Sequence, residues 1–282
     1  MTVIKYVRAM KRLAMGHTPI YIEYPLRLET RWEQAPGNPY LARILEASRS
    51  TVAANMRSLA GLEPVVQAID EGAYPSLSAI DWHNHMIPVV DALTLMWAAR
   101  GARTYMEVGS GNSTLYVKAA LLHAGSDARI VSIDPEPRAD VDAICDEVVR
   151  ERVEDVDPAV FDRLEPGDVL FIDNSHRSLM NSDVTVCMTE ILPRLRPGVL
   201  VGVHDIFLPY DYPRSWSERG YNEQYLLAAS LLANPGYFDI QFANHWAFKE
   251  GLHLGALDPI WSRLGDRARD RPPSAFWGVK KG

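Results

Sequence analysis

The sequence predicts an α/β protein built on a parallel β-sheet with helices on both faces. From residue 104 onward, short apolar segments alternate with segments of helical periodicity. Four of the apolar segments are almost continuous hydrophobic runs, as expected of parallel strands that are buried on both faces. Each of these four runs ends in glycine or in a polar side chain, which is typical of a ligand site at one sheet edge.

The elements follow one another in a regular order along this part of the chain. Strands are predicted at 104–108, 128–133, 168–172 and 199–203, with a weak one at 148–153. Helices are predicted at 113–124, 138–147, 184–195 and 222–232. Two further strands, 237–242 and 275–280, have only a long loop between them in this interpretation. We therefore expect these last two strands to form an antiparallel pair at one edge of the sheet.

The first hundred residues have a helical character. Apolar residues recur at helical spacing within 40–60, and a further helix is predicted at 87–99. We expect two units: a helical extension at 1–78, serving as a lid or a dimerisation element, and a cofactor-binding domain at 79–282. Residues 1–17 combine four basic side chains with apolar ones at helical spacing. This segment is expected to pack on its own domain or on a second subunit, with binding to a charged surface as the alternative.

Composition narrows the function classes. The 282 residues are 47% hydrophobic, which suffices for a full core, and carry a formal net charge of −7. An acidic balance argues against a nucleic-acid binder, since such proteins usually carry a basic stripe. No apolar run reaches the ~18 residues that a membrane span requires. The two cysteines, Cys145 and Cys187, suggest neither a zinc site nor a disulfide framework and fit the reducing cytoplasm.

The first strand is followed by a glycine turn, Glu107-Val108-Gly109-Ser110-Gly111-Asn112-Ser113-Thr114. Two glycines allow a tight turn and close approach of a ligand to the following helix. A dinucleotide fingerprint has a third glycine where this chain has Thr114, which argues against an NAD(P) oxidoreductase. The carboxylate of Glu107 suits a cationic ligand better than a pyrophosphate. Asp134, at the end of the second strand, could accept ribose hydroxyls or could cap the following segment.

Four motifs together carry a resemblance to a known family: EVGSGNST, SIDPEP, GDVLFIDNSH and LRPGVLVGVHDIF. In this order they resemble class I S-adenosylmethionine (SAM) methyltransferases, most closely the small-molecule enzymes of the methyltransferase 24 grouping and less closely the catechol-type O-methyltransferases. The resemblance covers about residues 80–282. It implies a Rossmann-like, seven-stranded, mostly parallel sheet with a reversed last strand.

The same resemblance implies SAM-dependent methyl transfer to an O or N atom of a small-molecule acceptor. Alternatives are a SAM enzyme that transfers another alkyl group or cyclises its substrate, and a non-catalytic binding protein that has kept the fold. The resemblance also assigns the cofactor-binding residues: Glu107, Gly109, Ser110, Gly111, Asn112 and Ser113 around the methionine half, Asp134 on the ribose, Val153 and Glu154 beside the adenine, and Asp173 at the next strand end.

Asp173, His176, His204 and Asp205 form the candidate reactive cluster. Asp173 matches a metal-binding aspartate of the catechol-type enzymes, whereas their Asp-Asn pair is replaced here by His204-Asp205. Asp173, His204 and Asp205 could bind a divalent metal, with Mn²⁺, Fe²⁺ or Zn²⁺ favoured by the imidazole. Without metal, His176 or His204 could act as general base, with Asp173 as a third catalytic residue. A purely hydrogen-bonded group is the remaining interpretation.

Two aromatic segments flank these motifs. The loop 207–213, with Trp216 and Tyr221 behind it, is expected to wall a substrate pocket, with plain packing as the alternative. The segment Trp82-His83-Asn84-His85 precedes the helix that leads into the first strand, and in similar enzymes it covers the cofactor. Its two histidines are expected to be structural or to face substrate rather than to bind metal.

Overall fold

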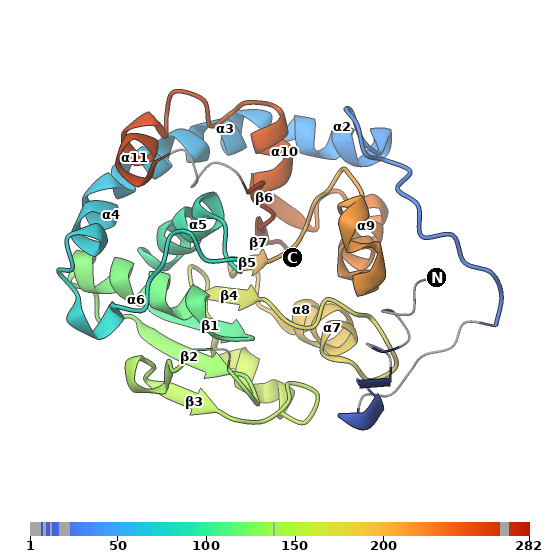
Figure 1. The fold of residues 1–282 in the computed structure, drawn as a ribbon, viewed down its shortest axis with the longest axis horizontal. Helices are drawn as coiled ribbons and strands as arrows, with labels where there is room; N and C mark the ends of the chain where they lie inside the picture. The colour runs from blue at the N-terminus through green and yellow to red at the C-terminus, as the bar shows by residue number, and fades with distance from the viewer. Residues whose placement is uncertain (1–6, 8–9, 12, 17–22, 138, 266–270) are drawn as a thin grey trace.

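The protein, described here by a computed structural model, is built on one seven-stranded sheet. The structure describes residues 7, 10–11, 13–16, 23–137, 139–265 and 271–282. The strand order is β3-β2-β1-β4-β5-β7-β6. The strands are β1 (Thr104–Val108), β2 (Arg129–Ile133), β3 (Glu147–Val149), β4 (Val169–Ile172), β5 (Leu200–Val203), β6 (Phe238–Ala243) and β7 (Phe276–Lys280). The first five strands are parallel, and β7 runs antiparallel to both β5 and β6. The Rossmann-like sheet with a reversed last strand is thereby confirmed (Figure 1).

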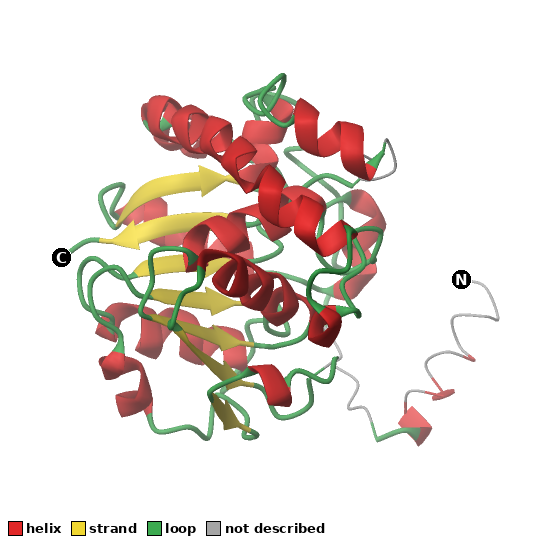
Figure 2. Ribbon diagram, turned by 90° about the vertical axis from the view of Figure 1, so that its left-hand side faces the viewer, coloured by secondary structure: helices red, strands yellow, loops and turns green. Residues whose placement is uncertain are grey.

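Helices lie on both faces of this sheet, as Figure 2 shows. They are α2 (Pro39–Ala47), α3 (Arg49–Ser58), α4 (Glu63–Asp70), α5 (Val89–Ala99), α6 (Asn112–Ala124), α7 (Asp183–Val186), α8 (Leu192–Arg194), α9 (Glu223–Ala233), α10 (Asn244–Lys249) and α11 (Asp258–Leu264). A π-helical turn, Cys187–Ile191, joins α7 to α8, so the helix predicted at 184–195 is continuous. The strand predictions agree with the structure to within a residue or two, except at β3.

Two predictions of local structure were wrong. The helix predicted at 138–147 is only a 3-10 turn, Asp142–Ile144, followed directly by β3. The carboxylate of Asp146 accepts the backbone N–H of Ile130 at 2.8 Å, which holds this segment extended beside β2. The long loop predicted between the last two strands contains α10 and α11, which are too short to give a clear periodicity.

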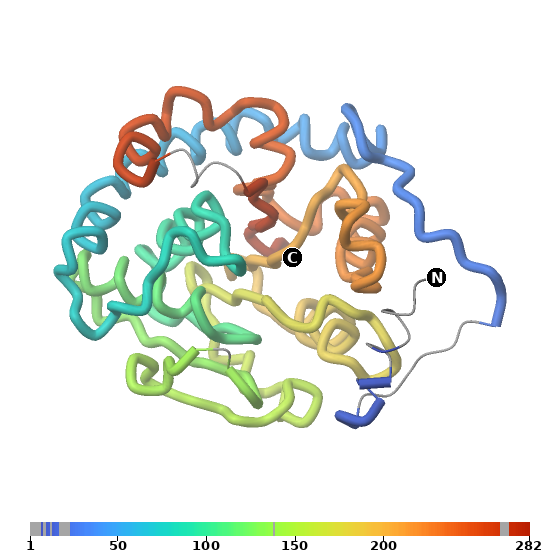
Figure 3. The backbone as a smooth tube through the Cα atoms, viewed as in Figure 1, coloured from blue at the N-terminus to red at the C-terminus, as the bar shows by residue number. Residues whose placement is uncertain are grey.

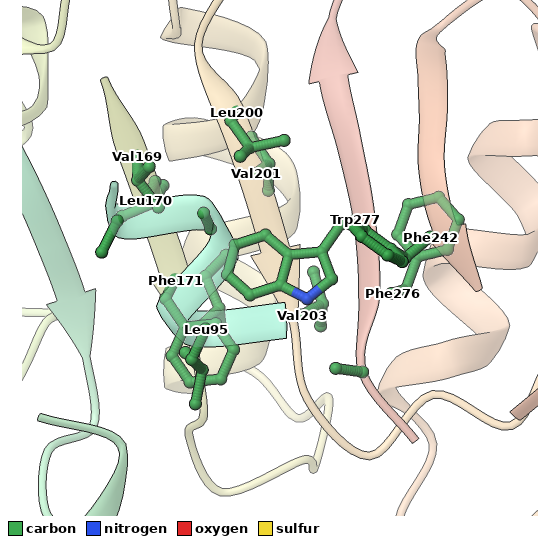
Figure 4. Packing of buried hydrophobic residues seen from close by; sticks show 14 of the residues in the cluster. Leu95, Val169, Leu170, Phe171, Leu200, Val201, Val203, Phe242, Phe276 and Trp277 are labelled. Atoms are coloured by element: carbon green, nitrogen blue, oxygen red, sulfur yellow. The ribbon is translucent and has the colours of Figure 1, made fainter. Parts of the chain in front are cut away.

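The core of the domain is centred on Trp277 of β7, shown in Figure 4. Its ring stacks on Phe171 of β4, with 5.4 Å between ring centroids. Its indole N–H donates to the hydroxyl of Thr94 in α5 at 3.0 Å. Gly202 of β5 lies directly beneath the ring, where a Cβ would come within 2.5 Å of it. The reversed strand is therefore joined by packing to β4, β5 and α5.

The N-terminal helices share this core. Leu45, Met56 and Leu59 are fully buried within the same hydrophobic cluster as the sheet. Helix α3 packs against β6 and α4 packs against α6, so the chain from α2 to α4 runs from the β6 end of the sheet to α6 (Figure 3). The helix expected within residues 1–17 lies largely outside the described residues. Within the described part of the chain, no helix is long and apolar enough to cross a membrane.

Candidate active site

A cavity of about 530 Å³ opens at the carboxyl ends of β1, β2 and β4. This volume lies within the range of small-molecule and cofactor sites. Most of the expected cofactor residues line it: Gly109, Ser110, Gly111, Asn112, Ser113, Asp134, Val153, Glu154 and Asp173. Met86 and Ile87, from the segment before α5, also contribute to its wall. The sheet thus gathers in one place residues that the sequence distributes over four loops.

Gly109 is required by the close approach of β1 to β4. Its backbone has a φ of +83°, a conformation that side chains rarely adopt. A Cβ at this position would lie 1.9 Å from the carbonyl oxygen of Asp173. Glycine therefore allows the ends of the two strands to meet at the floor of the cavity.

Glu107 lies behind the cavity wall rather than on it. The fully buried carboxyl group accepts hydrogen bonds from Tyr105 at 3.2 Å and Ser113 at 3.1 Å, and from the hydroxyl of Thr114. Burial raises the pKa of Glu107 to about 8, although the three hydroxyls oppose this shift. Through these hydrogen bonds Glu107 holds the start of α6. The expected contact between its carboxyl group and the cofactor cavity is not made.

Thr114 connects that carboxyl group to the glycine turn. Its hydroxyl donates to Glu107 and accepts the backbone N–H of Gly111 at 3.2 Å. The residue that the sequence treated as a missing third glycine is thus a bridge between β1 and the turn. In the sequence this role was visible only as the departure of Thr114 from the dinucleotide fingerprint, because the bridge forms only in the folded chain.

Asp134 lies at the rim of the cavity and is partly exposed. It accepts the N–H of Ser110 at 2.7 Å on one oxygen and the N–H of Glu136 at 2.8 Å on the other. Its remaining acceptor capacity faces the cavity, as a ribose site would require. Both sequence interpretations, ligand acceptor and backbone cap, are therefore compatible with its position.

The charged lining of the cavity is mainly acidic. Carboxylates outnumber cations in the lining. Arg152 supplies a guanidinium, and it pairs with Glu154 at 2.7 Å. The acidic residues of the lining are Asp134, Glu136, Glu154, Asp173 and Asp183. Such a lining attracts a cation such as a sulfonium, and it would repel a pyrophosphate. The donor set therefore fits SAM.

The four residues of the predicted reactive cluster come together beside this cavity. Asp173 Oδ1 lies 3.3 Å from His176 Nε2 and 3.3 Å from His204 Nδ1. Asp205 Oδ2 lies 3.4 Å from His176 Nε2. Among these four residues, Asp173 is the one that reaches the cavity, while both histidines are buried behind it.

Each histidine lies between carboxylates. The second nitrogen of His176 lies 2.9 Å from Glu223, and that of His204 lies 3.3 Å from Asp91. Burial alone would lower their pKa values, but hydrogen bonds to Asp173 and Glu223 raise the pKa of His176 to about 10. The charges of Asp173 and Asp205 raise that of His204 well above its ordinary value. Both shifts favour the protonated ring, which has no lone pair with which to accept a proton.

The partners Asp91 and Glu223 are functional candidates that sequence reasoning missed. Asp91 is fully buried and also accepts the N–H groups of Ser274 at 2.8 Å and Ala275 at 3.0 Å. The amide of Asn244 donates to it at 2.7 Å. Its signal in the sequence was a single charge in an otherwise apolar helix. A charged residue in such a helix predicts that Asp91 has a buried partner, but it does not identify that partner.

The donor set of the cluster does not fit a divalent metal. A metal-binding imidazole must offer an unprotonated nitrogen, whereas both nitrogens of His176 and of His204 face carboxylates. Within the described residues, no group of three or more His, Cys, Asp or Glu side chains is arranged to hold a metal ion. The geometry corresponds instead to the hydrogen-bonded interpretation of Asp173, His204 and Asp205.

The aromatic segments have different roles from those expected. Phe207, Tyr210 and Tyr212 are buried, and the first two pack against His245 rather than facing the cavity. Burial lowers the pKa of His245 to about 4, so this ring is neutral. The plain-packing alternative therefore describes this loop. Trp82 packs on Tyr116, while His83 and His85 are exposed.

Comparison with known proteins also connects the cavity-lining part of the chain with methyl transfer. A family model described as "Methyltransferase domain" matches residues 106–206, which include β1, β2, β4 and β5. No curated protein matches the chain in sequence. The match covers the glycine turn, Asp134 and the reactive cluster from Asp173 to Asp205.

Two solved structures are similar to this chain. A protein of Thermobifida fusca YX, provisionally described as a methyltransferase, is 15% identical over 86% of this chain and 84% of its own, with a TM-score of 0.37. The O-methyltransferase TomG of Streptomyces achromogenes, involved in tomaymycin synthesis and solved with SAM, is 19% identical over 78% of this chain and 89% of its own, with a TM-score of 0.34. These overall likenesses are weak, and the fold assignment rests on the chain's own strand order.

The family model places a methyltransferase domain over the part of the chain that carries the glycine turn, Asp134 and Asp173, and the strand order is that of a Rossmann-like fold.

Proposed function

We propose that this enzyme transfers the methyl group of SAM to an O or N atom of a small-molecule acceptor that binds on the Asp173 side of the cavity. The observation that carries this proposal is the acidic cavity of about 530 Å³ at the strand ends, lined by the matched motifs. The net charge of −7 supports a small-molecule acceptor rather than a nucleic acid. The two free thiols, Cys145 and Cys187, suit the cytoplasm.

When bound, SAM supplies an electrophilic methyl group on a sulfonium centre. The chain holds it with the residues of the turn 109–113, with Asp134 on the ribose and with Val153 and Glu154 beside the adenine. The charge of Asp173 is placed to stabilise the cationic centre, because Asp173 is the acidic residue shared by the cavity and the reactive cluster.

The histidines act in this proposal as positioning residues. Burial alone would raise the pKa of Asp173, but His204 and His176 hold it well below its usual range, so the carboxylate stays ionised. His176 and His204 also fix the orientation of that carboxylate from two sides. Neither ring removes a proton from the acceptor, so the proton that methylation of an O–H or N–H group releases passes to solvent water.

The helical extension at 1–78 is proposed to serve as a lid or to pair subunits in a homodimer. The support is its position: α2 contacts α9, which carries Glu223 of the reactive cluster, while α3 covers β6. A change in this extension could therefore reach the acceptor side without touching the cofactor cavity. Deleting residues 1–30 should alter oligomeric state or acceptor binding while leaving SAM affinity within a factor of about three.

Turnover with a panel of small hydroxy and amino compounds tests the proposed reaction. S-adenosylhomocysteine (SAH) is measured after incubation with SAM, using Asp173→Asn as the matched variant and Asp239→Asn, on an exposed face of β6, as the control. The proposal predicts acceptor-dependent SAH release that Asp173→Asn reduces at least tenfold. Persistent SAM binding without release for any acceptor would favour the non-catalytic binding protein instead.

A further inference from the structure

Three arginines gather on the acceptor side of the cavity from three separate loops. Arg177 follows β4, Arg219 precedes α9, and Arg271 precedes β7. Because β7 is antiparallel to β5, its first residues lie at the same sheet edge as the last residues of β4 and β5. This basic group therefore lies next to a cofactor cavity whose lining is mainly acidic.

Arg219 is held by stacking on aromatic rings. Its guanidinium carbon lies 3.8 Å from the ring centroid of Trp216 and 5.5 Å from that of Tyr221. The guanidinium of Arg177 lies 5.1 Å from the Tyr221 ring, and its Nε donates to the carbonyl oxygen of Arg219 at 2.8 Å. Arg177 thereby ties the two loops together and fixes the backbone that carries Arg219.

This aromatic and basic group is in contact with the reactive cluster. The ring of Tyr221 packs against His176, with 4.7 Å between centroids. His176 in turn contacts Asp173, which lines the cofactor cavity. The Tyr221 ring is therefore separated from Asp173 by one imidazole ring.

The arginines have donors left for a ligand. Among the described residues, none of Arg177, Arg219 and Arg271 forms an ion pair with a carboxylate of this chain. Arg271 is half-buried and donates to the carbonyl oxygen of Asn84 at 2.9 Å, and its charge interacts with those of Asp91 and Asp205 and with that of Arg219. A guanidinium stacked on a ring keeps its in-plane N–H groups available for paired hydrogen bonds to an oxyanion.

We propose that the acceptor carries an oxyanion, a carboxylate or a phosphate, which Arg219 and Arg271 bind beside Trp216 and Tyr221. This inference rests on the proposed function, since it names the chemical class of that enzyme's acceptor. The two halves of the active site then have opposite preferences: the acidic cavity selects a cationic cofactor and the arginines select an anionic acceptor. Opposite charges on the two bound molecules also favour their close approach.

Simple anions test this proposal on the full-length protein. Binding of benzoate, phenylphosphonate and benzamide is measured by calorimetry at millimolar concentration, with and without saturating SAH. At least one of the two anions should bind ten times more tightly than neutral benzamide. Whichever anion binds more tightly shows whether the site prefers a carboxylate or a phosphate-like group. Arg219→Gln and Arg271→Gln should each weaken that binding about tenfold and leave SAH affinity within twofold.

Arg214→Gln is the matched control, because Arg214 is an exposed arginine of the same 3-10 segment, Arg214–Arg219. It should bind the anion as the wild type does. Binding of both anions no tighter than that of benzamide, no anion binding at all, or an unchanged Arg219→Gln variant would each overturn the oxyanion site. Arg219 is exposed, so this variant remains decisive if Arg271→Gln fails to fold. Failure of the wild type to bind SAH contradicts the proposed function itself and is seen separately, because the anions are also titrated without SAH.

Discussion

The imidazole of His204 and the carboxylate of Asp91 lie 3.3 Å apart in the interior, although 113 residues separate them in the chain. Through this contact, α5 is joined to the end of β5 and, by the other ring nitrogen, to Asp173. Asp91 also accepts the backbone N–H groups at the start of β7. One buried carboxylate therefore connects three elements beneath the acceptor side.

Asp91→Asn should destabilise the protein by about 3–5 kcal/mol, because it leaves a buried imidazolium with one of its charged partners removed. The measurement is chemical denaturation at pH 7. Asp239→Asn, at an exposed position of β6, serves as the control and should change the free energy of unfolding by less than about 0.5 kcal/mol. A stability of Asp91→Asn equal to that of the control would contradict the role assigned to this carboxylate.

The stability of the protein should fall as pH rises above neutrality. The pKa of His176 is raised from 6.5 to about 10 in the folded state, so its contribution is full below pH 6.5 and is lost as pH rises toward 10. The buried carboxyl of Glu107, with a pKa raised to about 8, acts in the same direction, since its ionisation disfavours the folded state. Denaturation between pH 6 and pH 10 measures the slope.

His176→Asn should reduce that slope, and His85→Asn, at an exposed position, should leave it unchanged. A free energy of unfolding that stays level or increases from pH 6.5 to pH 10 in the wild type would show that His176 is not held as an imidazolium. The general-base role would then become available again.

Thr114→Val should weaken SAH binding by about 1–2 kcal/mol, because it removes the bridge between Glu107 and the N–H of Gly111. Thr114→Ser keeps the hydroxyl and should bind SAH within twofold of the wild type. Calorimetric titration compares the three proteins. Equal affinities for Thr114→Val and Thr114→Ser would mean that the bridge does not shape the cofactor turn.

Removal of divalent metals should leave turnover unchanged. The nitrogens of His176 and His204 face carboxylates, and this leaves no imidazole lone pair for a metal ion. SAH release is compared before and after dialysis against EDTA, with elemental analysis of the dialysed protein. Loss of activity that Mn²⁺ restores would reinstate Asp173, His204 and Asp205 as metal ligands.

The sequence was most informative where a pattern is local. Continuous apolar runs predicted β1, β2, β4 and β5, and the polar residue after each run predicted which side chains meet at the sheet edge. It was least informative where a contact joins distant segments. The partners of the histidines, Asp91 and Glu223, come from helices that no motif links to the strand ends. The upward pKa shifts of both rings therefore could not be predicted from the sequence.

Calorimetric titration of the wild-type protein with SAH tests the central claim most directly. We predict micromolar affinity, equivalent to about −8 kcal/mol. Asp134→Ala should weaken it by about 1–3 kcal/mol through loss of an acceptor at the cavity rim, and Asp140→Ala, at an exposed position of the same loop, should not. Absence of heat and of any thermal shift at millimolar SAH would contradict the assignment of the cavity to SAM.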